Sequence, residues 1–117
     1  MKITYLAGPM RGYPKFNFEA FYDLEDSLSG LGWKCLNPAR MDMEQFPGVS
    51  DPDKLPSQPM EAYVERDMNA LLMIKRMVTK GEATQGAVHF LPGWHKSVGA
   101  KAEHAIAEWL GLELIYL

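Results

Sequence analysis

The stretch ITYLAGPMRG, residues 3–12, decides the fold that we expect. Its first five residues form a short apolar run, which Gly8 and Pro9 end. A run of this kind is typical of a strand buried on both faces of a parallel sheet. The strand leads into a loop, Gly8 to Lys15, and an amphipathic helix follows. The chain therefore begins with a strand, a glycine loop and a helix.

Strands and helices alternate along the rest of the chain. We expect strands at residues 3–7, 33–36, 87–91 and 113–116, and helices that begin after a cap at Asn17 and over residues 60–72 and 98–110. Alternation implies right-handed crossovers and a parallel sheet between two layers of helices. The expected fold is α/β, a flavodoxin-like or Rossmann-like three-layer sandwich with a four- to five-stranded parallel sheet.

Two segments do not follow this pattern. Residues after Asn37-Pro38 and through Pro59 have no periodicity, so we expect a long loop, of which residues 41–59 cover the site or reach a neighbouring subunit. Residues 73–86 are ambiguous, because charged residues interrupt the apolar ones. They either extend the second helix or form a turn before the third strand.

Composition limits the classes of function. The chain has 117 residues, 47% of them hydrophobic, which suits one domain spanning residues 1–117. Its net charge of -3, without basic clusters, disfavours a polymeric nucleic acid as partner. A domain this small often builds its site across subunits, so we expect a homodimer or a larger homo-oligomer.

The expected location is the cytoplasm, and the expected protein is soluble. Cys35 is the only cysteine, so no disulfide framework can form within the chain. No apolar run approaches the length of a signal peptide core or a membrane span, so we expect no membrane partner. The three histidines have no metal-binding spacing, and we expect neither a metal ion nor another cofactor.

Asp67 is the most informative single position. A helical wheel of residues 60–72 places it on the apolar face between Tyr63 and Leu71, with Arg66 on the polar side. A carboxylate buried there needs a partner, a shifted pKa or a cavity to face. Asp67 is therefore either a structural residue bonded to backbone amides or a residue that faces a ligand.

Glu103 lies in the first turns of the helix expected over residues 98–110. The helical wheel gives this helix a core stripe of Val98, Ala102, Ala105, Ile106 and Trp109, a solvent side of Lys101, His104 and Glu108, and Glu103 on the border. A helix that follows the carboxyl end of a strand is where an α/β site places a nucleophile or general base. The alternative is a charge that only favours the helix dipole.

The loop after the first strand suits a phosphate group. It consists of Gly8, Pro9, Met10, Arg11 and Gly12. The glycines allow close backbone approach and the guanidinium supplies charge, while Ser97 and Gly99 at the start of the last helix can add a hydroxyl and an amide. The alternatives are a plain strand-to-helix turn and simple capping by Ser97. Trp94 either stacks on a nucleobase or packs at the rim.

Four segments together resemble the nucleoside 2-deoxyribosyltransferase superfamily, in a short branch often carried by bacteriophages. They are YLAGP at residues 5–9, RD at 66–67, FLPGW at 90–94 and GAKAEHA at 99–105. The resemblance implies that Glu103 attacks C1′ of a deoxyribose, that Tyr5 holds that carboxylate and that Asp67 works at the base side. The loop at 8–12 is also similar to the phosphate-binding turn of the deoxynucleoside 5′-monophosphate N-glycosidases of this superfamily, which implies phosphate binding by Arg11.

We therefore expect an N-glycosidase or 2-deoxyribosyltransferase that acts on a deoxyribonucleoside or its 5′-monophosphate. Glu103 has to stay ionised as the nucleophile, and Asp67 needs a raised pKa to protonate the leaving base. Water as acceptor gives a hydrolase and a second base gives a transferase, and the sequence leaves both open, together with the identity of the base. The alternative from another class is a non-catalytic protein that sequesters a nucleotide through the same loop.

Overall fold

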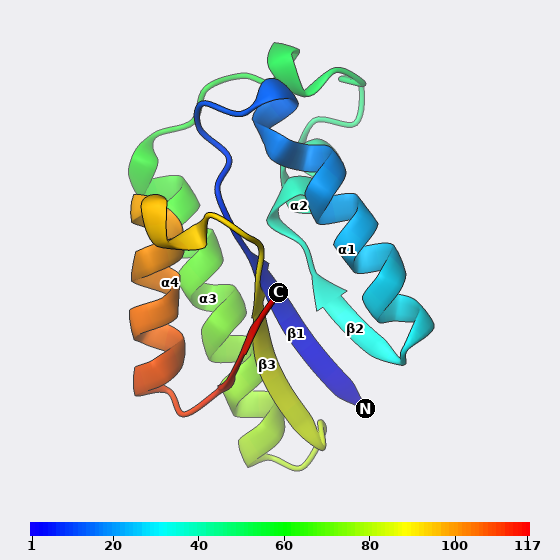
Figure 1. Cartoon of the computed structure of the whole chain (residues 1–117), viewed down its shortest axis with the longest axis vertical. Helices are drawn as coiled ribbons and strands as arrows, with labels where there is room; N and C mark the ends of the chain where they lie inside the picture. Colours follow the sequence, from blue (N-terminus) through cyan, green and yellow to red (C-terminus); the bar gives the residue numbers. More distant parts are fainter.

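A parallel sheet lies between two layers of helices in the computed structural model, which describes residues 1–117 (Figure 1). The strands are β1 (Lys2–Ala7), β2 (Trp33–Leu36), β3 (Gln85–Phe90) and β4 (Glu113–Tyr116), in the spatial order β2-β1-β3-β4. The helices are α1 (Phe18–Gly30), α2 (Pro38–Gln45), α3 (Met60–Thr79) and α4 (Val98–Trp109), with 3₁₀ turns η1 (Pro14–Asn17), η2 (Pro52–Lys54) and η3 (Trp94–Lys96). All three strand pairs are parallel, which confirms the expected α/β three-layer class.

The central strand β1 distributes its side chains between the two layers. Side chains alternate along a strand, so Tyr5 joins the apolar cluster under α3 and α4, whereas Leu6 joins the cluster under α1 and α2. Figure 1 shows these two helix pairs on opposite sides of the sheet. Tyr5 therefore points toward α3 and α4, the helices that contain Asp67 and Glu103.

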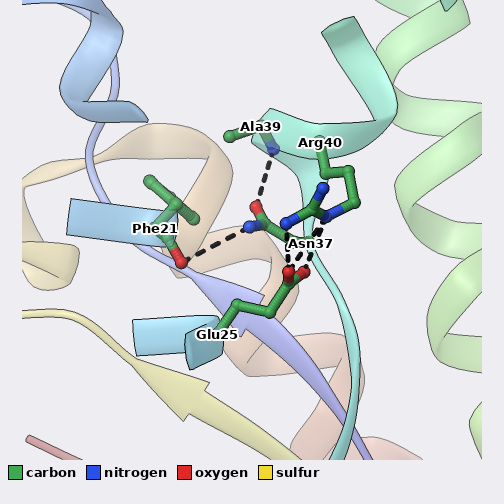
Figure 2. Close-up of polar contacts among 5 residues, drawn as sticks. All are labelled: Phe21, Glu25, Asn37, Ala39 and Arg40. Carbon is green, nitrogen blue, oxygen red and sulfur yellow. Dashed lines mark hydrogen bonds and ion pairs between the residues drawn. The ribbon is translucent and has the colours of Figure 1, made fainter. Parts of the chain in front are cut away.

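The segment after β2 is not the continuous loop that we expected, because α2 occupies its first part. Asn37 caps this helix: its Oδ1 accepts a hydrogen bond from the Ala39 amide at 3.0 Å, and its Nδ2 donates to the Phe21 carbonyl of α1 at 3.3 Å (Figure 2). From the sequence we interpret Asn37-Pro38 as the end of a strand before a loop, yet proline is favoured in the first turn of a helix.

An ion pair also fixes α2 against α1. The guanidinium of Arg40 contacts both carboxylate oxygens of Glu25, as Figure 2 shows, and it lies 4.9 Å from the ring centroid of Tyr22. The Arg40 side chain is 44% exposed, so solvent screens the pair and it contributes little free energy of folding. The ion pair does fix the position of α2, which occupies the first part of the expected loop.

Helix α3 resolves the ambiguous segment at 73–86. The helix continues to Thr79 instead of ending near residue 72, and β3 begins at Gln85, two residues earlier than expected. Ile74 is fully buried and Val78 packs against the same cluster, so the charged residues between them leave the inner face apolar. No helix, α3 included, is long and apolar enough to cross a membrane.

Asn17 does not cap α1, contrary to expectation. Its backbone is left-handed, with φ 62°, and its side chain makes no capping hydrogen bond. Its Nδ2 instead donates to the carbonyl of Pro9 at 3.0 Å. The residue therefore holds the glycine loop against the start of the helix.

Candidate active site

Tyr5 and Glu103, 98 residues apart in sequence, form a buried hydrogen-bonded pair. The Tyr5 hydroxyl donates to the Glu103 carboxyl group. Tyr5 is fully buried and only 7% of Glu103 is exposed. Asp67 lies close enough that its charge raises the pKa of both residues. The three residues that the sequence selected for chemistry therefore meet in one cluster, contributed by β1, α3 and α4.

Helix α4 turns a different face to the sheet than its apolar pattern predicted. The buried residues are Ala100, Glu103 and Ala107, whereas Val98 and Trp109 of the expected core stripe are exposed. The two alanines let the helix lie close to the sheet, and Glu103 occupies the space between them. Glu103 is thus at the centre of the buried face, not on its border as expected.

The pKa of Glu103 is raised to about 8. Burial is the main cause, the charge of Asp67 adds to it, and the hydrogen bond from Tyr5 acts in the opposite direction. Burial also raises the pKa of Asp67, but the neighbouring Arg66 cation opposes that shift. Glu103 is therefore the carboxyl group that holds a proton near neutral pH. Glu103 was expected to be ionised, so its raised pKa differs from the expectation for the unliganded protein, whereas the raised pKa of Asp67 agrees with it.

Arg66 is a member of the site that the helical wheel wrongly placed on the polar side. Its Nε donates to Asp67 Oδ1 at 3.0 Å, and its Nη1 pairs with Asp42 of α2. Its guanidinium also lies 5.6 Å from the ring centroid of Tyr63. Asp42 could not be paired with it from sequence, because the helix that contains Asp42 was not recognised. Arg66 connects α2 directly to Asp67.

A cavity of about 280 Å³ lies next to Arg66. It is lined by Gln45, Gln58, Ala62, Tyr63 and Arg66. Two of these side chains are primary amides, which offer both hydrogen-bond donors and acceptors, and one is aromatic. Such a lining suits a flat, polar-edged ligand. This cavity could not be predicted from sequence, because Gln45 and Gln58 come from α2 and from the segment after η2.

Comparison with known proteins gives one match. Over residues 1–116 the sequence matches a family described as Domain of unknown function (DUF4406). The chain belongs to the DUF4406 family. No curated protein and no solved structure matches it. The description of the DUF4406 family states no activity, so the chemistry of this member rests on its site.

In this DUF4406 domain the glycine loop is shaped first by packing. A Cβ on Gly8 would lie 2.7 Å from the Cβ of Leu91, so only glycine allows β1 and β3 to end this close together. Gly93 has φ 87°, and a Cβ there would lie 3.0 Å from the Tyr13 hydroxyl. The loops after β1 and β3 therefore touch each other. Arg11 is exposed and takes part in none of the ion pairs of the chain.

The other loop residues predicted to bind phosphate have separate surroundings. Pro9 is buried, and Met10 packs against the apolar cluster under α1. Gly12 is exposed, with φ 82° and open space around it. Ser97 caps α4, since its Oγ accepts from the Ala100 amide at 3.2 Å, and Gly99 is exposed. Ser97 is thus a cap, the alternative that the sequence had left open.

Trp94 packs in an aromatic array at the edge of the domain. Its ring stacks on His104, with centroids 4.5 Å apart and planes 12° from parallel, and it lies 5.0 Å from Phe90. His104 was expected to point to solvent but is half-buried, with Nε2 at 2.7 Å from the Tyr116 hydroxyl. No group of three or more His, Cys, Asp or Glu side chains is arranged to hold a metal ion.

Proposed function

We propose that this DUF4406 chain cleaves or exchanges the N-glycosidic bond of a deoxyribonucleoside or its 5′-monophosphate. The observation that carries the proposal is the buried Glu103 carboxyl group, bonded to Tyr5 and placed beside a second acid, Asp67. Two carboxyl groups with different environments are what glycosidic bond cleavage requires. The motifs that resemble the nucleoside 2-deoxyribosyltransferase superfamily select the same residues.

The raised pKa of Glu103 means that the pair of acids begins the reaction with one proton. We propose that this proton passes from Glu103 to Asp67 when substrate binds. The Glu103 carboxylate then attacks C1′, the bond from C1′ to the base nitrogen breaks, and its electron pair stays on the nitrogen. Asp67 delivers the proton to that nitrogen, so the base leaves neutral. Tyr5 keeps its hydrogen bond to Glu103 and positions the attacking oxygen.

The second step returns Asp67 and Glu103 to their starting state, in which the two acids share one proton. Asp67, now ionised, takes a proton from a water molecule or from the ring nitrogen of a second base, and that acceptor attacks C1′. The bond between C1′ and Glu103 breaks, and its electrons return to the carboxylate. Water gives a hydrolase and a base gives a transferase. In both cases one proton again remains on the two acids.

The surroundings of the acids support a nucleoside or nucleotide substrate. The cavity beside Arg66 offers the amides of Gln45 and Gln58 to the polar edge of a base and the ring of Tyr63 to its face. Arg11 has no partner in the chain and is available to a 5′-phosphate. We place this activity in the cytoplasm, where such substrates occur, and it needs no cofactor.

Release of the free base, followed by liquid chromatography, tests the proposal. Deoxyribonucleosides and their 5′-monophosphates are incubated with and without a second base, using wild type and Glu103→Gln. Wild type is expected to release a base and Glu103→Gln is not, while Glu82→Gln, a change at an exposed turn, keeps full activity. If wild type binds a nucleotide but releases nothing, the sequestering protein replaces the enzyme as the best hypothesis.

Substitution of Arg11 tests the phosphate separately. Arg11→Ala is expected to raise KM for the monophosphate about 10-fold or more and to leave the nucleoside unchanged, because one charge-assisted contact is lost. Arg76→Ala, which removes an exposed arginine from α3, is the matched control. An equal effect of Arg11→Ala on both substrates would remove Arg11 from the phosphate site.

A further inference from the structure

Helix α4 has a second apolar face that nothing in the domain covers. Val98, Ala102, Ala105 and Trp109 are exposed, Val98 at 81% and Trp109 at 86%. On a helix these four residues lie within about 60° of one another and point away from the buried Glu103. We call them the outer stripe. A tryptophan exposed to this degree is an unusual feature of a surface that faces only water.

The spacing of the outer stripe is the spacing of helix packing. Its residues follow one another at four, three and four positions, which is the repeat that packs one helix against another. The two central residues are alanines, which allow two helix axes to come close, and the two outer residues are large. By size the order is large, small, small, large, and it is the same in both directions.

We propose that the outer stripe binds the outer stripe of a second copy of this chain, with the two α4 helices antiparallel. A two-fold axis between Ala102 and Ala105 then places Val98 against Trp109 of the second copy and Ala102 against its Ala105. Each large residue meets a large one and each small residue a small one. The interface is self-complementary, as a two-fold interface has to be.

Charge selects the antiparallel arrangement. Lys101 and Glu108 lie on the same flank of the stripe, seven residues apart, and both are exposed. Antiparallel helices bring equal flanks together, so Lys101 of one copy lies beside Glu108 of the other, and this pair occurs twice. A parallel arrangement would place Lys101 beside Ile106, which offers no charge.

The expected dimer is weak. Four stripe residues and their flanks bury less area than a standard interface, of which each partner contributes about 800 Å². A dissociation constant on the order of micromolar is therefore expected. The inference does not depend on the proposed function, because the stripe is on the opposite side of α4 from the acid pair.

Sedimentation velocity over a concentration series tests the dimer. Wild type is expected to change from monomer to dimer as concentration rises from about 0.1 to about 100 µM, around the expected constant. Trp109→Ala is expected to weaken the association about 10-fold or more. Leu31→Ala, which removes an apolar side chain 68% exposed at the end of α1, is the control and is expected to leave it unchanged.

Charge exchange distinguishes the antiparallel arrangement from every other. Lys101→Glu alone and Glu108→Lys alone each place like charges together and are expected to weaken the dimer about 10-fold. An equal mixture of these two variants restores opposite charges at both contacts and is expected to form a heterodimer of wild-type strength. These exposed substitutions preserve the fold. A wild type that stays monomeric at the highest concentration, or a mixture that associates no better than its components, would overturn the proposal.

Discussion

The two faces of the sheet each bury a titratable side chain, but only the face under α3 and α4 places a second acid beside it. Under α1 and α2, His89 is 3% exposed. Its Nδ1 forms a hydrogen bond with the Thr4 hydroxyl at 2.7 Å, and its ring packs edge-on against Trp33. Burial lowers its pKa, so it is neutral. Under α3 and α4, Glu103 has a second acid, Asp67, and a cation, Arg66, close by, and Arg66 also lines a cavity.

The difference shows that burial alone does not make a catalytic residue. His89 is satisfied by one neutral partner, and its charged neighbours, Glu113 and Lys2, shift its pKa in opposite directions. Glu103 shares its environment with Asp67 and Arg66, so the titrations of the two acids depend on each other. The following predictions compare the two faces, beginning with the largest effect.

Activity separates the faces most strongly. Glu103→Gln is expected to reduce base release about 10⁴-fold or more, because the nucleophile is lost, although the folded structure remains. His89→Asn keeps a hydrogen-bonding atom next to Thr4 and is expected to leave kcat within about 3-fold, since a packing residue does not touch substrate. Steady-state rates for both variants measure the contrast. Comparable losses from the two would mean that burial, not the acid pair, explains the effect of Glu103.

Asp67 is expected to act on both rate and pH dependence. Loss of the proton donor in Asp67→Asn reduces kcat about 10²-fold or more. Activity of the wild type is expected to fall as pH rises through about 8, where the pair loses its proton. Because the charge of Asp67 raises the pKa of Glu103, Asp67→Asn moves this alkaline limb to lower pH. A limb that stays in place would show that a different group titrates there.

The contributions of Glu103 and His89 to the free energy of unfolding are expected to change with pH in opposite directions. Between about pH 4.3, the unfolded value for glutamate, and about 8, folded Glu103 holds a proton that the unfolded chain has lost. Its contribution to stability therefore falls as pH rises through that window. Below about pH 6.5 the unfolded chain protonates His89 while the folded protein does not, so its contribution falls as pH falls.

Thermal denaturation at several pH values measures these slopes. The Tm of Glu103→Gln relative to wild type is expected to rise by about 10 °C or more from pH 5 to pH 8. The Tm of His89→Asn relative to wild type is expected to rise by about 2 °C or more when the pH is lowered from about 7 to about 5. Parallel curves for a variant and wild type would remove that residue from the pH dependence of stability.

Ser97 gives the smallest effect. Ser97→Ala is expected to cost about 1 kcal/mol, because the Ala100 amide loses its cap. KM for a monophosphate is expected to stay unchanged, since the Ser97 oxygen is already engaged within α4. Denaturant titration and substrate kinetics check the two parts. A higher KM for the monophosphate alone would return Ser97 to the phosphate site.

The fold was predictable from sequence where local patterns act alone. The apolar run at residues 3–7 and its glycine ending gave β1 and the loop, and the alternation of elements gave the parallel three-layer class. Helix α2 was missed because it is only eight residues long and begins at Pro38. Asn17 was misplaced because the capping rule takes no account of the Pro9 carbonyl, which competes for its side chain.

The site was predictable in its acids but not in their protonation. Asp67 and Glu103 stood out because they interrupt apolar surroundings, but the shifts of their pKa values depend on burial and on contacts with each other and with Arg66, which only the folded chain brings into place. The face of α4 was misread for a specific reason. Its most regular apolar stripe is exposed, while the buried face consists of two alanines and Glu103. Periodicity detects an apolar surface, not the partner that covers it.

The position of Arg66 has a consequence for protein engineering. One guanidinium binds Asp42 of α2 and Asp67 beside Glu103, so α2 and the acid pair cannot be redesigned independently. A transplanted segment 38–59 that changes base preference but lacks an acid at position 42 would leave Arg66 free to move. The proton affinity of Asp67 would change with it. Altered specificity would then come with an altered pH optimum, and both have to be selected together.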